Sequence, residues 1–413
     1  MSIYYISSAG LDTNDGLTEN TPWKTIAKAN EAMIGGDELR FHSGETFYGR
    51  LKPKAGPDRE HPTTYSSYGK GKKPTVSQYK KANLGAWEFD GEKKLWRLDL
   101  TDTSRFTGNI IDINTNVGFM KIDGKIFARK KYDFAKLELE WDFINDDRYV
   151  WVKTDKDPSE LASSIEFACN IGCVGFCDNL KVVGIIFRGT GGHGISGTVN
   201  GAYVADCEFH ELGGSELPGY PTPGTRYGNG VECWANSSDV TVERCRFSEI
   251  YDVAITMQGR PVKKSWTNMH FNDNVMWNCQ QCFEIWSSGD VPDTGFVYCY
   301  FERNVCIDSG YCFGFEVRPN KDCSSHLLIY GLGCPRCEII VRNNVFKHAR
   351  FATLYKSGGP KEVPETYEIR DNVIIIPKGQ DIAFACGNDP EIVAAFNRKI
   401  AAENCVIEEE YSL

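Results

Sequence analysis

The stretch VTVERCRF, Val240–Phe247, is one of seven octads that share a pattern along the chain. The other six are LKVVGIIF (Leu180–Phe187), AYVADCEF (Ala202–Phe209), MHFNDNVM (Met269–Met276), CYFERNVC (Cys299–Cys306), IIVRNNVF (Ile339–Phe346) and YEIRDNVI (Tyr367–Ile374). Successive octads begin 22, 38, 29, 30, 40 and 28 residues apart. A unit that recurs at such intervals is typical of repeat folds, in which each copy stacks on the next.

The sixth position of the octads changes in an ordered way. It is occupied in turn by Ile185, Cys207, Cys245, Asn274, Asn304, Asn344 and Asn372. Asn side chains at one repeat position hydrogen-bond to one another when the copies stack. The pattern therefore predicts a column of Asn side chains in the later turns.

A second apolar strand follows most octads, as in NGVECW and CFEIWSS. We align these strands on their central residues Ile195, Val231, Ile255, Ile285, Val317 and Leu354. Loops inserted at fixed corners, such as Glu211–Gly230 and Asn320–Pro335, explain the longer intervals. Short strands with no helices between them predict an all-β right-handed parallel β-helix, a solenoid. A β-sandwich or propeller is the alternative, and it accounts less well for in-line octads and corner loops.

Both ends of a solenoid expose sheet edges and need caps. The segment Thr21–Met33 predicts a capping helix at the N-terminus, and Asp389–Asn404 predicts one at the C-terminus. We expect one continuous domain in two parts. Residues 1–168 form the N-terminal cap and the first turns, with a β-rich insertion around Trp87–Trp151, and residues 169–413 form the main turns and the C-terminal cap.

The overall charge limits the class of partner. The 413 residues carry a net charge of −10, and no basic run appears, which disfavours nucleic acid. No apolar run reaches membrane length, so a membrane partner is not expected. No signal peptide is visible, which predicts a cytoplasmic protein or a secreted one whose signal has been removed. The oligomeric state stays open.

The 16 cysteines are spread along strand-like segments, so most are predicted to be small core residues in a reducing compartment. Two groups of cysteines are candidate metal ligands. Cys169, Cys173 and Cys177 are spaced by four, and Cys334 and Cys337 form a CxxC motif. Neither has a partner pair at zinc-site spacing, so no metal is predicted.

The N-terminal segment carries a resemblance. YYISSAGLDTNDGLTENTPWKTIAKAN (Tyr4–Asn30), followed by GDELRFHSGETFYGRL (Gly36–Leu51), resembles the N-terminal cap of bacterial pectate-lyase-like parallel β-helix proteins. Together with the repeats from Leu180 to Ile374, the resemblance covers most of the chain. It implies a carbohydrate-active enzyme. That superfamily includes lyases, hydrolases, epimerases and non-catalytic adhesins, so the reaction stays open.

Side chains alternate between the two faces of a strand, so the neighbours of the inward central residues point outward together. Exposed Trp is unusual on a solvated face, and the like charges of Glu284 and Glu316 on adjacent strands cost stability. This face is therefore the predicted site. Its expected catalytic residues are Glu232, Asp252 and Glu284. Its expected substrate-binding residues are Glu316, Arg318, Trp234, Trp286, Gln258, His210, His193, Arg226 and Asn229.

Two carboxylates that flank a glycosidic bond can act as general acid and base, which predicts a glycoside hydrolase acting on a carbohydrate polymer or oligosaccharide. Glu232 is expected about two turns from Glu284, which leaves room for a water molecule. The first alternative is a lyase or epimerase acting on a uronate, with Arg318 as base and Ca²⁺ bound by the carboxylates. The second is a non-catalytic glycan-binding solenoid. No cofactor is expected, apart from Ca²⁺ in the lyase.

Overall fold

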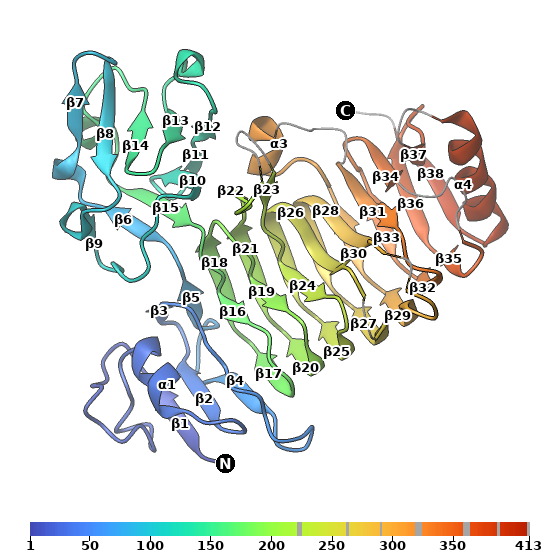
Figure 1. Cartoon of the computed structure of the whole chain (residues 1–413), viewed down its shortest axis with the longest axis horizontal. Coiled ribbons are helices and arrows are strands. Elements are labelled where there is room, and N and C mark those ends of the chain that lie inside the picture. Colours follow the sequence, from blue (N-terminus) through green and yellow to red (C-terminus); the bar gives the residue numbers. More distant parts are fainter. Residues whose placement is uncertain are drawn as a thin grey trace.

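A computed structural model describes residues 1–220, 225–261, 264–289, 291–318, 324–357, 364–385 and 389–410. Most of the chain forms a stack of parallel strands (Figure 1). Two sheets run the length of this stack, and each gains strands in chain order, as a coil does when every turn pairs with the turn before it. The prediction of an all-β chain built mainly from parallel sheets is confirmed.

The first sheet has ten strands, and its register confirms the octad alignment. The strands are β1 (Ile3–Ile6), β2 (Glu38–His42), β4 (Thr63–Tyr68), β17 (Leu180–Val183), β20 (Asn200–Ala205), β25 (Ser238–Glu243), β27 (Trp266–Asn272), β29 (Gly295–Glu302), β32 (Arg336–Arg342) and β35 (Tyr367–Arg370). The first residues of the seven octads, from Leu180 to Tyr367, pair in sequence across β17 to β35.

The second sheet has 16 strands and branches. Its main path is β3 (Thr46–Tyr48), β5 (Thr75–Ser77), β18 (Ile186–Thr190), β21 (Glu208–Leu212), β26 (Arg246–Gly259), β28 (Val275–Ser287), β30 (Val305–Ile307), β33 (Val345–Lys347), β36 (Val373–Pro377) and β38 (Val406–Glu410). The branch is β16 (Val174–Gly175), β19 (Ile195–Gly197), β24 (Val231–Trp234), β31 (Ser325–Leu332), β34 (Ala352–Lys356) and β37 (Ala383–Ala385). The long strands β26 and β28 bend round a corner and belong to both parts.

The alignment of the second strands was wrong at two of its six positions. Ile255 pairs with Phe283, not Ile285, so the aligned residue is two positions too far along β28; a register shift of one residue between Ile250 and Val253, where β26 turns the corner, contributes to this error. An alignment error of two residues keeps the same side chains on the outer face.

The next strand in the series is β31, which lies inside the segment expected to be a corner loop. The segment FGFEV, predicted as a strand, forms the short helix α3 (Phe313–Val317) instead. Phe313 of α3 stacks on Phe127 at 4.6 Å between ring centroids and contacts Phe119 at 4.7 Å. The alternating apolar residues of FGFEV favour a strand. The aromatic contacts of Phe313 with the insertion favour the helix instead.

The predicted column of Asn side chains is confirmed. Nδ2 of Asn274 donates to Oδ1 of Asn304 at 3.0 Å, Asn304 donates to Asn344 at 3.1 Å, and Asn344 donates to Asn372 at 2.9 Å. Each Oδ1 also accepts a backbone N–H from the turn before, and each Nδ2 donates to a backbone carbonyl. The column therefore satisfies the polar groups of a buried corner.

Replacing Asn304 by Ala should lower the free energy of unfolding by about 2–4 kcal/mol, since it leaves a cavity and several buried groups without partners. Denaturant unfolding monitored by circular dichroism measures this. The control is Asn200→Ala, because Asn200 is exposed on β20. Equal losses in both variants would contradict a stabilising role for the column.

The insertion consists of two five-stranded sheets with a hydrophobic core of their own. One holds β6 (Lys80–Ala82), β9 (Phe106–Thr107), β10 (Val117–Ile122), β11 (Ile126–Phe127) and β15 (Ile165–Cys169), and the other holds β7 (Glu88–Asp90), β8 (Leu95–Asp99), β12 (Arg129–Lys130), β13 (Asp142–Asn145) and β14 (Tyr149–Val152). Helix α2 (Pro158–Leu161) precedes β15. Figure 1 shows the insertion standing beside the early turns of the stack.

Both capping helices form. Helix α4 (Pro390–Ala402) begins after Asp389, whose side chain accepts the N–H of Glu391. Helix α1 (Ile26–Ala32) begins later than expected from Thr21, because the side chain of Thr25 is the N-cap and accepts the N–H of Lys28. Within the described ranges no helix has the length and apolar character needed to cross a membrane.

The described cysteines are free thiols, and all of them except Cys177 and Cys405 are buried. This confirms that most are core residues. Aromatic side chains stack beside them, as in Phe209 and Phe247, whose ring centroids lie 4.8 Å apart.

Candidate active site

The predicted outer face lies on β24, the second half of β26 and the second half of β28. Ser196, Glu232, Thr256 and Glu284 are paired in sequence across four adjacent strands. Glu232 and Glu284 are thus two strands apart, about 9–10 Å between Cα atoms at the usual strand spacing. Both side chains are buried, with 5% and 7% of their surface exposed.

Three polar side chains hold Glu232. His193 Nε2 lies 3.0 Å from Glu232 Oε2, and Asn229 Nδ2 donates to the same oxygen at 2.9 Å. Gln258, on the adjacent strand, also hydrogen-bonds to this carboxylate. Burial raises the pKa of Glu232, but the interactions with His193, Asn229 and Gln258 outweigh it and hold the pKa below its ordinary value.

The geometry also assigns the proton on His193. Its Nδ1 accepts the backbone N–H of Asn229 at 3.0 Å, so that nitrogen carries no proton. The proton is therefore on Nε2, which donates to Glu232. An N–H of His193 directed at the carboxylate favours the ionised form of Glu232.

Glu284 has the opposite environment. Its Oε2 accepts the hydroxyl of Thr256 at 2.9 Å. Burial is the main cause that raises the pKa of Glu284 to about 8, the negative charges of Asp252 and Glu232 raise it further, and Thr256 and Arg318 lower it only in part. The carboxyl is therefore mainly protonated at pH 7, and it can donate a proton.

Asp252 and Arg318 form an ion pair beside Glu284. Arg318 follows α3, and its Nη2 donates to Asp252 Oδ1 at 2.8 Å. Its Nη1 donates to the backbone carbonyl of Tyr251 at 2.8 Å, and its guanidinium lies 5.1 Å from the centre of the Tyr251 ring. A guanidinium held by a carboxylate stays charged, which makes it a poor Brønsted base.

Two tryptophans continue the face. Trp234, Gln258 and Trp286 are paired across β24, β26 and β28. The Trp234 and Trp286 rings lie 6.5 Å apart with an angle of 52° between their planes, and 42% of the Trp234 surface is exposed. Such rings offer apolar surface next to the hydrogen-bonding groups around Glu232.

A hollow of about 560 Å³ lies beside His193, whose ring contacts Glu232. His193, Ser196 and Tyr227 line it from the stack, and the rings of His193 and Tyr227 meet edge to face at 4.8 Å. Its further lining residues are Arg50, Lys52, Asp112, Ile113, Asn114, Asn170, Ile171 and Gly172. The N-terminal turns and the insertion therefore supply the second wall of this hollow. Sequence alignment of the repeats could not reveal these residues, since they lie outside the octads.

Three predicted residues are placed differently. Arg226 is buried and donates to the carbonyls of Gly214, Gly118 and Val317, so it ties the loop to the insertion and to α3. His210 lies on β21, where its ring contacts Ser248 and Glu208. The backbone of Glu316 is in α3, and its side chain lies outside the described residues.

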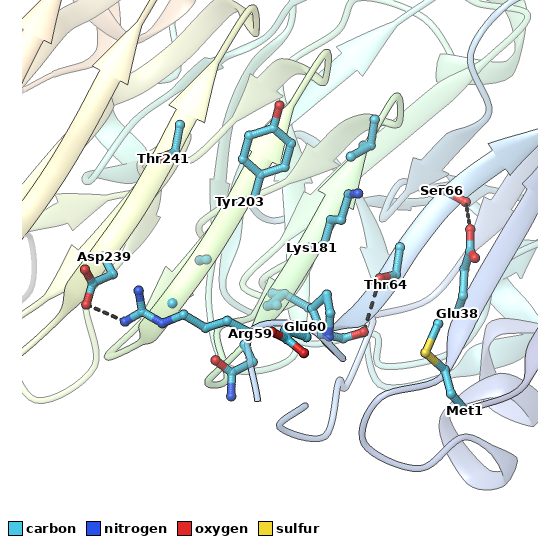
Figure 2. A pocket seen from close by; sticks show the side chains of 16 residues that line it. Met1, Glu38, Arg59, Glu60, Thr64, Ser66, Lys181, Tyr203, Asp239 and Thr241 are labelled. Atoms are coloured by element: carbon cyan, nitrogen blue, oxygen red, sulfur yellow. Dashed lines mark hydrogen bonds and ion pairs between the residues drawn. The ribbon is translucent and has the colours of Figure 1, made fainter. Parts of the chain in front are cut away.

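A second hollow, of about 620 Å³, lies on the outer face of the ten-stranded sheet (Figure 2). Three of its charged side chains, Arg59, Asp239 and Glu38, have partners in the wall. Arg59 contacts Asp239 at 2.5 Å, and the Ser66 hydroxyl donates to Glu38 at 2.6 Å. It lacks the pair of carboxyl groups with opposite pKa shifts, so the face around Glu232 and Glu284 is the candidate active site.

Comparisons with known proteins show the fold. No protein-family model matches the chain. One segment is 41% identical over 73 residues to a lacto-N-biosidase from Bifidobacterium longum subsp. longum, which covers 16% of this chain and 4% of that protein. The match therefore spans a small part of this relative.

Solved structures match over longer ranges at low identity. The structure of XylC with xylose aligns with a TM-score of 0.57 over 93% of this chain and 67% of that chain, at 11% identity. A GH136 lacto-N-biosidase from Eubacterium ramulus aligns with a TM-score of 0.43 over 100% and 68%, at 13% identity. The likeness to XylC shows a shared fold, and the predicted resemblance in fold is confirmed.

Proposed function

We propose that this chain is a right-handed parallel β-helix glycoside hydrolase, with Glu284 as general acid and Glu232 as general base. The observation that carries the proposal is the opposite shift of the two pKa values on one face. Titratable groups whose environments push their pKa values apart are typical acid and base partners. The match of one segment to a lacto-N-biosidase supports an oligosaccharide or polysaccharide as the substrate class.

In this mechanism the sugar on one side of the scissile bond occupies the hollow by His193, and the other lies along Trp234 and Trp286. Glu284 protonates the leaving oxygen as the glycosidic bond breaks. Glu232 takes a proton from the water molecule that attacks the anomeric carbon. Two carboxyl groups separated by two strands leave space for that water, the arrangement of inverting enzymes. Burial keeps Glu284 protonated, and the negative charge of Asp252 adds to this effect.

A lyase is the second candidate, and one observation favours it. Arg50 and Lys52 line the hollow and could bind the carboxylate of a uronate. The ion pair of Arg318 with Asp252 counts against Arg318 as the proton-abstracting base. Calcium dependence remains a prediction of this candidate alone.

One screen separates the candidates. The protein is incubated with neutral and uronate-containing glycans, with and without EDTA. Reducing ends and the absorbance of an unsaturated product are measured together. Reducing ends without that absorbance, unchanged by EDTA, support the hydrolase. Absorbance that EDTA abolishes would overturn the proposal in favour of the lyase. Binding with no product would indicate a non-catalytic glycan-binding protein.

The pH dependence of kcat/KM should be bell-shaped, with a basic limb near pH 8. The proton on Glu284 is needed, so the rate should fall as pH rises through the pKa of about 8. The acidic limb should lie below pH 4.5, since the pKa of Glu232 is held below its ordinary value. Initial rates from pH 3 to 10 measure both limbs. A rate that rises steadily to pH 10 would contradict the assignment of Glu284.

A further inference from the structure

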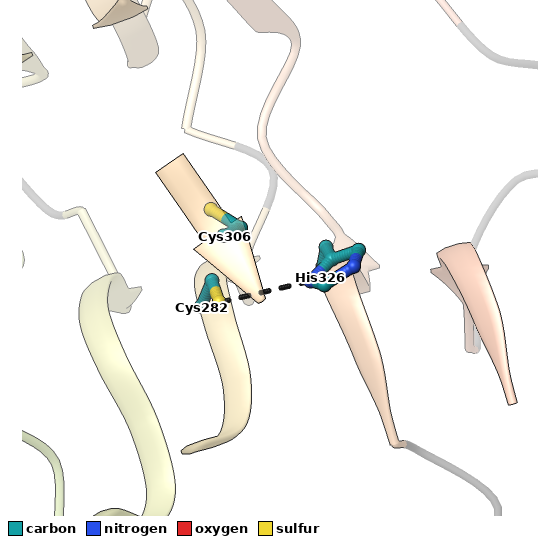
Figure 3. A group of neighbouring side chains, drawn as sticks. All are labelled: Cys282, Cys306 and His326. Atoms are coloured by element: carbon teal, nitrogen blue, oxygen red, sulfur yellow. Dashed lines mark hydrogen bonds between the residues drawn. The ribbon is translucent and has the colours of Figure 1, made fainter. Parts of the chain in front are cut away.

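Three side chains with metal-binding atoms converge in the interior of the stack (Figure 3). They are Cys282 on β28, Cys306 on β30 and His326 on β31, and each is fully buried. Their donor atoms all lie within 4.8 Å of one another. Cys306 and His326 come from one turn of the coil, and Cys282 comes from the turn before it.

The distances suit a common centre. Cys282 Sγ lies 3.8 Å from His326 Nδ1, and the hydroxyl of Ser309 lies 2.7 Å from the same nitrogen and 3.2 Å from Cys282 Sγ. Ligands of a tetrahedral zinc ion with bonds of about 2.0–2.3 Å are about 3.3–3.8 Å apart. Small shifts of these side chains would bring the thiol and imidazole atoms to that spacing.

The polar groups of the cluster are incompletely satisfied by protein partners. His326 Nε2 is buried, and no group in the described residues forms a hydrogen bond with it. Burying this polar ring beside two thiols, with the Phe346 ring 5.6 Å away, costs free energy, and coordination of a metal by Nδ1, the nitrogen that faces Cys282, would offset part of that cost. Nε2 points away from Cys282 and is not a ligand in this arrangement. His326 on β31 has the same position in its strand as Ala254 on β26, two strands earlier in the sheet. The fold therefore does not require a histidine at this position.

We propose that Cys282, Cys306 and His326 bind one Zn²⁺ ion, with the Ser309 hydroxyl next to the fourth position. The two thiols release two protons to solvent and coordinate as thiolates, and the imidazole coordinates as the neutral base. Two thiolates and Zn²⁺ sum to zero charge, which lowers the cost of burial. The ion would link two successive turns of the coil beneath the strand that carries Glu284, and it would enter as the turns stack.

The test is the metal content of the full chain purified from zinc-supplemented cells. Native mass spectrometry and elemental analysis should find about one zinc per chain. Growth with Co²⁺ should give thiolate-to-cobalt charge-transfer bands in the near ultraviolet and the visible bands of a tetrahedral ion. These two measurements use the wild-type chain, so they do not depend on whether a variant folds.

Cys282→Ala should reduce the zinc content at least about tenfold, whereas the matched control Cys299→Ala, a buried cysteine of the ten-stranded sheet, should retain it. A wild-type mass equal to the chain alone would overturn the proposal. So would a disulfide between Cys282 and Cys306, or zinc retained equally by both variants. Glycan hydrolysis is not a readout here, so failure of the zinc site and failure of the proposed activity are separate results.

Discussion

Glu284→Gln should lower kcat/KM by about 10²–10⁴-fold on a glycoside with a poor leaving group, because the amide cannot supply the proton of general acid catalysis. The side chain keeps its size and can still accept the hydroxyl of Thr256. An aryl glycoside with an acidic phenol needs little protonation, so its rate should fall much less. Initial rates on the two substrates measure this difference, and equal losses on both would contradict the role of general acid.

The matched control for Glu284 is Glu243→Gln. Glu243 points outward from the ten-stranded sheet and pairs with Tyr203 and Arg244, away from the proposed site. This variant should keep wild-type rates on both substrates. If it loses as much activity as Glu284→Gln, the effect of both substitutions is on folding.

Stability gives an independent readout of the same carboxyl. The pKa of Glu284 is raised to about 8 in the folded chain, so between pH 4.5 and 8 the unfolded chain binds fewer protons at this group. The free energy of unfolding should therefore fall with rising pH across this window. Glu284→Gln removes that contribution, so the decline should be shallower in the variant.

The octads could be predicted because two signals agree in them. Apolar residues alternate with a period of two, and the Asn residues recur at a position where each one satisfies the next. The strands of the branch lack such a marker. Their register depends on a shift at the corner between Ile250 and Val253, and on whether FGFEV or SHLLIYGL supplies the strand of one turn. Contacts of Phe313 with the insertion decide that choice, and local sequence does not contain them.

The sequence predicted which face of the strands carries the candidate site. Glu232, Glu284, Trp234 and Trp286 share it because side-chain parity survives an error of two residues in register. Which of Glu232 and Glu284 is the general acid and which the general base was not predictable from sequence, since both are glutamates on β-strands. Their pKa values differ because His193 and Asn229 donate to one of them, while Asp252 lies by the other. The Cys282 cluster was missed for a related reason: its members come from three strands and have no sequence spacing in common.

Glu232→Gln should lower kcat by about 10²–10⁴-fold on every substrate, including aryl glycosides, since activation of water by the base is needed whatever the leaving group. The difference from Glu284→Gln on an aryl glycoside therefore distinguishes base from acid. Glu368→Gln is the control, because Glu368 points outward from β35 and pairs with Arg370.

The stereochemistry of the wild-type reaction tests the same assignment without a variant. Glu232 and Glu284 are two strands apart, a separation that suits a water molecule between the base and the sugar. The first product should therefore have the anomeric configuration opposite to that of the substrate, which proton NMR detects before mutarotation. Retention would require a nucleophile nearer to Glu284. Asp252, whose charge already raises the pKa of Glu284, would then take that role, and Glu232 would be left to bind substrate.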